Sequence, residues 1–409
     1  MKIKTDFLIT FGLLFSMLST IMARYYNTFN YVDEAVSVIA FIFIFGTFVF
    51  KQNYYDKFSR MMFFVITLLI IIGLLSNLTS IYNFNKVAVI QDVLMSLRPL
   101  LAIEFCYIIS RQYTITYISE KLYKFSCVTI TILFLIGLYS QLRETTFALS
   151  ERRYGLYPFK FVFSFPADLG FVVLILLSLL LVATKKNTLI YVGILIIGSC
   201  TILFTTKVQV FIFPILLLFC YLLWKFRLKI NIFTIVIMGI ALFFVGLLQI
   251  NDYFMDLAHY SPRRILLLGA FDLANKNFPF GTGFSSYASE MANRYYSPIY
   301  IEKGFHNLYA LDLQAAREGG ALNDSFVSMV IGQFGWIGTV VFYFPFVIII
   351  KRAKENFDYK KFSIVFSIVV TYIIASIGSG TIKANTGILG LAFLGILMAQ
   401  TKKIEGKYK

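Results

Sequence analysis

Two adjacent arginines in the second half of the chain have the residue type and position to bind an anion. Arg263 and Arg264 follow Ser261-Pro262, which is typical of a helix that begins with an N-cap residue and a proline at its first position. The first turn of a helix carries partial positive charge, so cations there are unfavourable unless an anion binds beside them. The pair therefore predicts a phosphate or diphosphate site, with solvated surface charges as the alternative interpretation.

Two further cationic segments lie between apolar stretches. Arg152 and Arg153 precede the sequence Tyr154-Gly155-Leu156-Tyr157-Pro158, and Lys207 ends a short polar turn that begins with two threonines. Together with the first arginine pair, these residues are expected to surround one outer mouth of the protein. Guanidinium and ammonium groups gathered there would suit the polyanionic headgroup of a lipid-linked substrate.

Ionisable residues also occur inside apolar stretches. Asp92, Arg98 and Glu104 are spaced six residues apart, and Asp168 lies near the start of another apolar stretch. Charges at membrane depth are costly and by default indicate function. Arg98 precedes Pro99, and a proline break would open backbone carbonyls and a polar cavity. We therefore predict Arg98 and Asp168 as intramembrane polar residues of the site, with an interhelical ion pair as the structural alternative.

Several kinds of chemistry have no residues to support them. The chain has only two histidines, and its four cysteines lie in apolar stretches without metal-ligand spacing. No glycine-rich phosphate loop or zinc-protease motif occurs, so we expect neither a metal nor any other cofactor. Asp324 precedes an apolar run, where an aspartate ordinarily caps a helix.

The composition determines which elements must position these residues. Hydrophobic residues make up 59% of the 409 residues and charged residues 14%, and the mean hydropathy is +0.78. Soluble domains have about 45–50% apolar and about 25% charged residues, so a soluble enzyme is excluded. A spanning helix needs about 20 mostly apolar residues. We predict an all-α, polytopic integral membrane protein with about 12 transmembrane helices; the candidate spans are 7–23, 35–50, 61–80, 87–109, 126–142, 162–183, 188–204, 208–224, 232–249, 326–350, 362–377 and 384–400.

The distribution of basic residues predicts the orientation of these spans. With the N-terminus inside, the inner connections contain 22 Lys and Arg in 63 residues, and the outer connections contain 14 in 121 residues. This difference agrees with the positive-inside rule and places both termini in the cytoplasm. The formal net charge of +16 therefore reflects topology, and we expect no nucleic-acid partner.

One outer connection is far longer than the others. The chain divides into residues 1–249 with helices 1–9, a large extracytoplasmic loop at 250–325, and residues 326–409 with helices 10–12 and a cytoplasmic tail. The loop is expected to contain a short amphipathic helix that begins near Arg263 and is followed by a turn at 278–283. Its many Phe and Tyr residues fit sugar binding by stacking, or docking of the loop at the membrane interface.

Four short motifs and their placement resemble the Wzy-type O-antigen polymerase and O-antigen ligase superfamily. The resemblance lies in Arg263-Arg264 with Asn277-Phe278-Pro279-Phe280-Gly281-Thr282-Gly283, in Asn323-Asp324-Ser325-Phe326 with Gln333-Phe334-Gly335-Trp336-Ile337-Gly338, in Arg152-Arg153-Tyr154-Gly155-Leu156-Tyr157, and in Thr205-Thr206-Lys207. Ligases usually carry a histidine where the loop re-enters the membrane, and Asp324 falls at that spacing here. This departure favours a polymerase over a ligase.

The resemblance implies a metal-independent glycosyltransferase in the bacterial cytoplasmic (inner) membrane. It would transfer a growing glycan from undecaprenyl diphosphate to a new lipid-linked repeat unit at the outer face. Arg152, Arg153, Lys207, Arg263 and Arg264 would hold the diphosphates and stabilise the leaving group.

The resemblance also implies a general base near the acceptor hydroxyl, for which Asp324 is the first candidate and His306 the second. Its expected partners are the undecaprenyl-diphosphate-linked oligosaccharide and membrane lipid, with a chain-length regulator and a flippase as further candidates. A ligase that transfers the glycan to a lipid acceptor and a flippase for lipid-linked oligosaccharides are the alternative functions.

Overall fold

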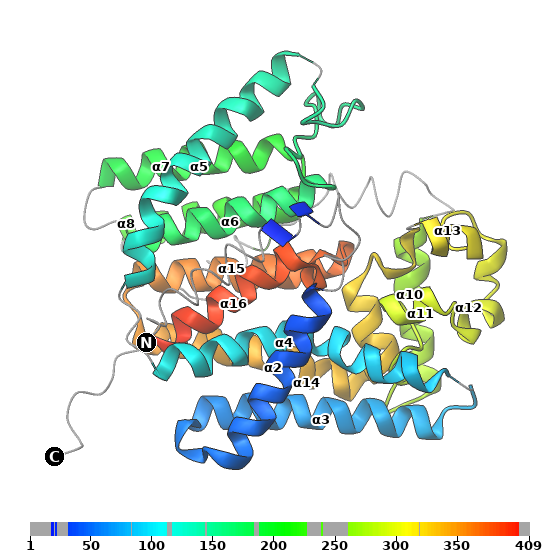
Figure 1. Ribbon diagram of the computed structural model, residues 1–409. Helices are drawn as coiled ribbons and strands as arrows, with labels where there is room; N and C mark the ends of the chain where they lie inside the picture. Colours follow the sequence, from blue (N-terminus) through cyan, green and yellow to red (C-terminus); the bar gives the residue numbers. More distant parts are fainter. Residues whose placement is uncertain are drawn as a thin grey trace.

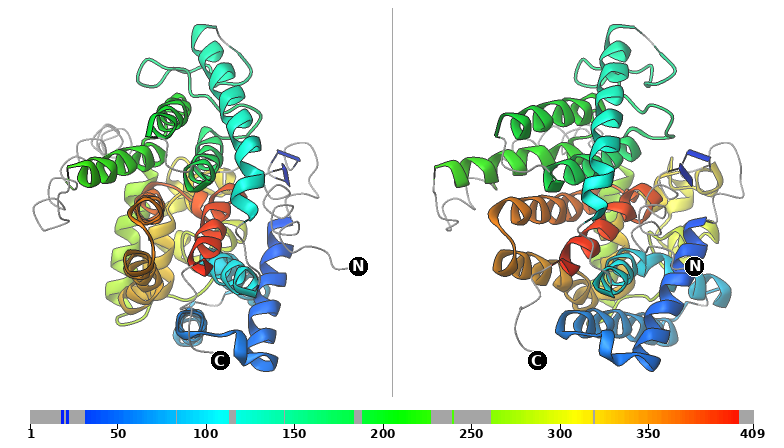
Figure 2. Two further views of the ribbon diagram at one scale, coloured as in Figure 1. Left: turned by 90° about the vertical axis from the view of Figure 1, so that its left-hand side faces the viewer. Right: turned by 60° about the vertical axis from the view of Figure 1, so that its left-hand side comes forward.

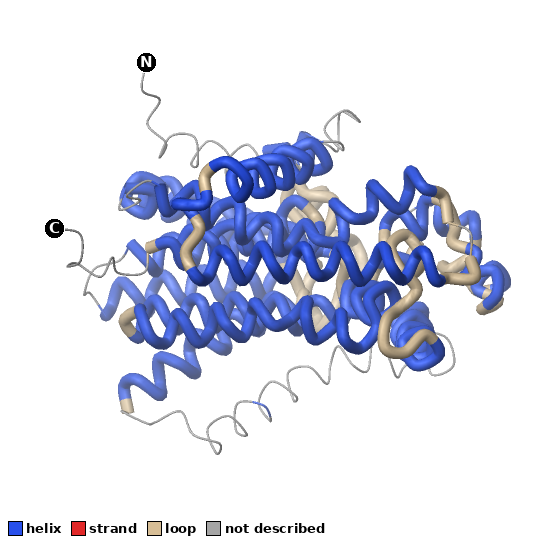
Figure 3. The backbone as a smooth tube through the Cα atoms, turned by 90° about the horizontal axis from the view of Figure 1, so that it is seen from below, coloured by secondary structure: helices blue, strands red, loops and turns tan. Residues whose placement is uncertain are grey.

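The structure is a computed structural model, and it describes residues 18–19, 21–22, 32–82, 84–112, 117–143, 145–183, 188–226, 239, 261–318 and 320–400. Most of the predicted spans 7–23 and 232–249, the start of the large loop and the C-terminal tail lie outside the described residues. The described part of the chain consists of helices and loops without a strand (Figure 3).

Ten apolar helices coincide with predicted spans. They are α2 (Val32–Phe50), α3 (Lys57–Thr79), α4 (Lys86–Gln112), α5 (Tyr117–Leu142), α6 (Pro166–Ala183), α7 (Thr188–Phe204), α8 (Val208–Lys225), α14 (Phe326–Asn356), α15 (Tyr359–Gly378) and α16 (Asn385–Ala399). Six of these, namely α3, α4, α5, α8, α14 and α15, are long and apolar enough to cross a membrane. The other four are shorter apolar helices. The prediction of an all-α fold is therefore confirmed for the described residues, and six of the helices have the length and composition to span a membrane.

The exposed side chains of the helices agree with a lipid environment. Large apolar residues face outward on α2, α3, α5 and α14, and Val340 on α14 is 70% exposed. A soluble protein would leave no such extended apolar surface in contact with water. The internal core is also apolar, which is the pattern of a helix bundle surrounded by lipid.

The helices pack around α4 and α16. α16 is buried over most of its length between α4 and α6, and α15 packs against α8 and α14. Figures 1 and 2 show α5, α6 and α7 on one side of the molecule and α2 and α3 on the opposite side, with α14, α15 and α16 between them. The N-terminal ends of α4 and α14 meet the described part of the predicted large loop (Figure 1).

That loop is itself helical. It contains α10 (Pro262–Lys276), α11 (Glu290–Arg294), α12 (Pro298–Glu302) and α13 (Leu313–Glu318), with 3-10 turns η4 (Phe305–Asn307) and η5 (Ala321–Asn323). α10 begins after Ser261 with Pro262 in its first turn, as the sequence predicts. The remaining 3-10 turns are η2 (Gln52–Tyr54) and η6 (Thr381–Lys383), which connects α15 to α16.

Candidate functional site

The segment after α10 inserts into the helix bundle and is held there by a break in α14. Gly335 has φ 65° and ψ −165°, which interrupts the helical backbone inside α14. The carbonyls of Gly332 and Gln333 accept hydrogen bonds from the backbone N–H groups of Thr282 (3.0 Å) and Gly283 (2.9 Å). Residues 281–289 are all buried. The predicted turn at 278–283 is therefore an anchor that joins the large loop to α14.

Asp92 on α4 connects this anchor to the membrane helices. Its Oδ2 accepts a hydrogen bond from Gln333 Nε2 (2.7 Å) and one from the backbone N–H of Ser285 (2.6 Å). Asn77 on α3 bonds in addition to both backbone groups of Phe284. The polar residues of α3 and α4 thus position the loop, and through it the start of α10.

Arg263 and Asp324 form an ion pair that joins α10 to the entry of α14. Arg263 Nη2 lies 2.9 Å from Asp324 Oδ2, and the Asp324 side chain is 42% exposed. Asp324 follows η5, whereas Ser325 is the N-cap of α14 and accepts from the N–H of Ser328. The interpretation of Asp324 as the cap of this helix is therefore wrong, because the neighbouring serine already fills that role.

Arg98 is buried in the middle of the bundle, next to the η6 turn. It is 4% exposed, its Nε donates to Ser37 Oγ (3.0 Å) on α2, and its Nη1 donates to the backbone carbonyl of Lys383 (2.9 Å). A guanidinium is the form of cation best suited to such a position, because it stays charged and donates several hydrogen bonds at once.

Lys383 is a buried cation that the sequence analysis did not single out. It is 8% exposed, and its Nζ has no hydrogen-bond partner in the described structure. Burial lowers the pKa of its ammonium group, against the opposing charges of Glu290 and Asp92. Asp324 also lies within electrostatic reach. Its position as the one basic residue of the short outer connection 378–383 is a signal that could have identified it.

Asp168 and Lys207 add polar interactions between α6, α8 and α16, which begins close in sequence to Lys383. Asp168 in the first turn of α6 accepts a hydrogen bond from Thr386 Oγ1 (2.8 Å), in the first turn of α16 and one turn after Lys383. Lys207 is the N-cap of α8 and lies within electrostatic reach of Asp168. The structure thus links, through contacts and charge interactions, predicted site residues that are up to 226 positions apart, from Arg98 to Asp324.

The other predicted residues have different surroundings. Arg152 stacks on Tyr157 of its own loop, with its Cζ 4.4 Å from the ring centroid, and its neighbour Arg153 is exposed. Arg264 is exposed on α10, next to the paired Arg263. His306 is exposed on η4. These four residues are thus surface-exposed, in contrast to the buried or half-buried Arg98, Lys207 and Arg263.

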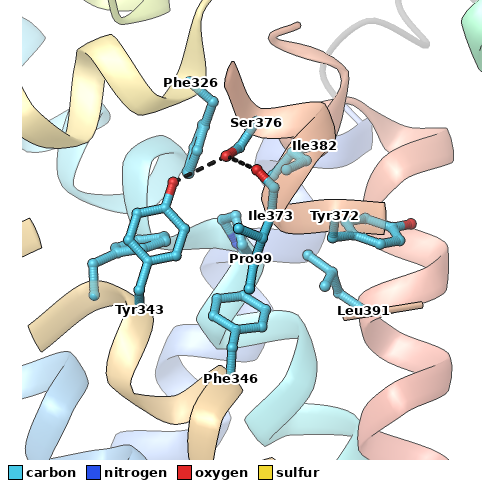
Figure 4. Close-up of a pocket in the computed structure, with 10 residues that line it drawn as sticks. Pro99, Phe326, Tyr343, Phe346, Tyr372, Ile373, Ser376, Ile382 and Leu391 are labelled. Atoms are coloured by element: carbon cyan, nitrogen blue, oxygen red, sulfur yellow. Dashed lines mark hydrogen bonds between the residues drawn. The ribbon is translucent and has the colours of Figure 1, made fainter. Parts of the chain in front are cut away.

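An apolar pocket lies beside the buried cations. Its lining comes from α4, α14, α15, η6 and α16 and consists of Pro99, Phe326, Phe342, Tyr343, Phe346, Tyr372, Ile373, Ser376, Ile382 and Leu391 (Figure 4). Pro99 follows Arg98 and Ile382 precedes Lys383, so apolar and cationic surfaces adjoin along the same turns.

Comparisons of the chain with protein-family models, with curated proteins and with solved structures found no match. The functional conclusion therefore rests on the residues and their arrangement. That arrangement combines cations and an apolar pocket, which suits an amphiphilic anion.

Proposed function

We propose that the protein is a polysaccharide polymerase of the bacterial cytoplasmic membrane. It would transfer the growing glycan from undecaprenyl diphosphate to a new lipid-linked repeat unit at the outer face. The proposal includes twelve spans, both termini in the cytoplasm and a large extracytoplasmic loop. The observation that carries it is the linked set of Arg98, Lys207 and Arg263, which come from distant parts of the sequence. Lys207 and Arg263 belong to predicted outer connections, and Arg98 lies midway along a predicted span.

The chemistry proposed for this set is electrostatic. The acceptor hydroxyl oxygen attacks the anomeric carbon of the donor glycan, and the bond from that carbon to the diphosphate oxygen breaks. The diphosphate leaves with the electron pair, and Arg98, Lys207 and Arg263 stabilise its charge. Such groups act strongly because they are preorganised in surroundings with little water.

The general base proposed for this transfer is Asp324. Its Oδ2 is oriented by Arg263, and its side chain is accessible to an acceptor. The carboxylate would take the proton of the attacking hydroxyl. His306 remains the second candidate, and its exposed position on η4 requires the acceptor to reach the loop surface.

The apolar pocket has a role in the same proposal. A polyprenyl chain attached to the bound diphosphate needs an apolar path away from the cations. The apolar side chains that line the small pocket beside Arg98 and Lys383 are the surface proposed to contact the first isoprene unit. A lipid-linked donor would thus be held by charge at its head and by apolar contact at its tail.

The test is the size of the surface glycan in a strain that lacks the gene. We expect single repeat units displayed outside the membrane, and restoration of long chains by the full-length protein. Units trapped inside would indicate a flippase, and long chains that are made but not attached to their lipid acceptor would indicate a ligase; either result would refute the polymerase.

Arg263 and Arg264 provide a matched pair for the site. Arg263→Ala should reduce chain extension at least tenfold, because the leaving diphosphate loses a charged contact and Asp324 loses its partner. Arg264→Ala removes the same charge from an exposed neighbouring position and should have a much smaller effect. Glycan size is measured at equal amounts of inserted protein. Equal effects of both variants would contradict the assignment of Arg263.

A further inference from the structure

A group of polar side chains, buried except for the part-exposed Glu290, comes from α4, α11 and η6. This polar cluster consists of Asp92, Glu290, Asn293 and Lys383. Lys383 and Asn293 are each 8% exposed, and neither Lys383 Nζ nor Asn293 Oδ1 has a hydrogen-bond partner among the described residues. Folded proteins pair nearly all such groups. A buried donor and a buried acceptor without partners are therefore candidates for hydrogen bonds to a ligand.

The two groups belong to the same part of the molecule. α11 packs against α4, and α4 packs against η6, which ends with Lys383. The carboxylates of Glu290 and Asp92 lie within electrostatic reach of the Lys383 ammonium, and Glu290 also pairs with Arg294 (3.3 Å). Asn293 follows Glu290 by three residues on α11, and residues at this spacing share one face of a helix.

The donor and the acceptor of the cluster can be compared with the hydrogen-bonding groups of each part of the proposed substrate. A diphosphate offers only acceptors, so it would satisfy Lys383 Nζ and leave Asn293 Oδ1 without a donor. A polyprenyl chain would satisfy neither group. A sugar hydroxyl both donates and accepts, so the hydroxyls of a sugar can satisfy a donor and an acceptor at once.

We propose that the polar cluster binds a sugar of the glycan through its hydroxyl groups, with Lys383 donating to one hydroxyl and Asn293 accepting from another. This inference rests on the proposed function for the identity of the glycan, because it adds a sugar subsite to the diphosphate site. The subsite adjoins the buried cations, since Arg98 donates to the backbone carbonyl of Lys383. A sugar next to the diphosphate would therefore lie between Arg98 and α11.

The experiment measures binding of two probes to the detergent-purified full-length protein. The first probe is the free repeat-unit oligosaccharide released from the surface polysaccharide of the source cells, without lipid or phosphate. The second probe is inorganic diphosphate. We expect the wild-type protein to bind both. Asn293→Leu should weaken binding of the oligosaccharide at least tenfold and leave binding of diphosphate within twofold.

Thermal stability separates a ligand-binding role from a structural one. Asn293→Leu replaces a buried acceptor without a partner by an apolar side chain of similar volume, so it should raise the Tm of the ligand-free protein. Like Asn293→Leu, Lys383→Met should raise the Tm of the ligand-free protein and weaken binding of the oligosaccharide. Asn307→Leu, at an exposed position of η4, is the control and should change neither quantity.

Three results would overturn the proposal. They are failure of the wild-type protein to bind the free oligosaccharide, variants that weaken diphosphate binding but not oligosaccharide binding, and a lower Tm in both variants. Failure of the proposed function is a separate outcome: a protein that binds the oligosaccharide but does not restore long chains would retain the sugar subsite and lose the polymerase assignment.

Discussion

At the scale of single residues, the entry to α14 separates a structural role from a chemical one. Ser325 caps the helix, while the adjacent Asp324 pairs with Arg263 across 61 positions of sequence. The side-chain oxygen of a capping residue accepts a hydrogen bond from a backbone N–H group in the first turn of its own helix. Asp324 does not cap α14, so its carboxylate is available for the proposed proton transfer.

Asp324→Asn tests this division. An amide keeps the shape of the side chain but cannot accept the proton, so we expect chain extension to fall by a factor of about 100 or more. The stability of α14 should stay unchanged because Ser325 remains. Glu318→Gln, which neutralises an exposed carboxylate of the same loop, is the control. Activity of Asp324→Asn within a factor of about two of the wild type would reject Asp324 as the base.

At the scale of elements, the break in α14 explains how the large loop is attached. Gly335 adopts a backbone conformation that side chains disfavour, and a Cβ there would collide with the backbone of Phe280 and Gly281. Gly281 in turn lies against the carbonyl groups of Gly332 and Gln333. Two glycines thus allow two backbone segments to approach and to exchange hydrogen bonds inside the bundle.

Gly335→Ala should therefore destabilise the protein. A positive φ in this region costs a residue with a Cβ about 1–3 kcal/mol, and the collision with Phe280 adds to that cost. Thermal unfolding of the purified protein in detergent should show a lower Tm together with loss of chain extension. Gly46→Ala in α2, where a Cβ would meet no atom within 4 Å, is the matched control. Equal Tm values for the two variants would contradict the role of the break.

At the scale of the whole molecule, polar clusters occupy both predicted ends of the bundle. Asp56, the N-cap of α3, accepts hydrogen bonds from Ser59 N (3.0 Å) and Tyr107 Oη (2.7 Å) and pairs with Arg111 and Arg352. All three charged residues belong to connections or helix ends predicted to face the cytoplasm. These contacts bring together, at one end of the bundle, charged residues that are all predicted to be cytoplasmic.

The cluster at Asp56 should make the protein sensitive to acid. Burial alone would raise the pKa of Asp56, but the hydrogen bonds from Ser59 and Tyr107 and the charges of Arg111 and Arg352 hold it below its usual 3.8. A carboxyl with a lowered pKa stabilises the folded state above the pKa of the unfolded chain, and this contribution is lost as the pH falls through the folded-state pKa.

Asp56→Asn removes that contribution. We expect a loss of about 1–3 kcal/mol of stability near neutral pH, because two arginines lose a charged partner. The Tm of the variant should also fall less steeply than that of the wild type between about pH 6 and about pH 3. Asp358→Asn, which keeps the N-cap of α15, is the control. Parallel pH profiles for the wild type and Asp56→Asn would refute this account.

The sequence by itself determined the class of protein, the positions of the ten apolar helices that the structure describes and the start of α10. These features are local, because runs of apolar residues, charge bias and Ser-Pro pairs act over one helix or one turn. The outer cations were also recognisable, because each interrupts or flanks an apolar run.

The tertiary structure decided which of these residues meet. Arg98 and Lys383 are 285 positions apart, and no local pattern predicts that a buried turn brings them together. The same holds for the anchor between residues 281–283 and α14, whose motif resembles a simple turn in sequence. Exposure was likewise undetermined, since Arg263 and Arg264 are adjacent in sequence, yet helix geometry places Arg263 in a half-buried position and Arg264 in an exposed one.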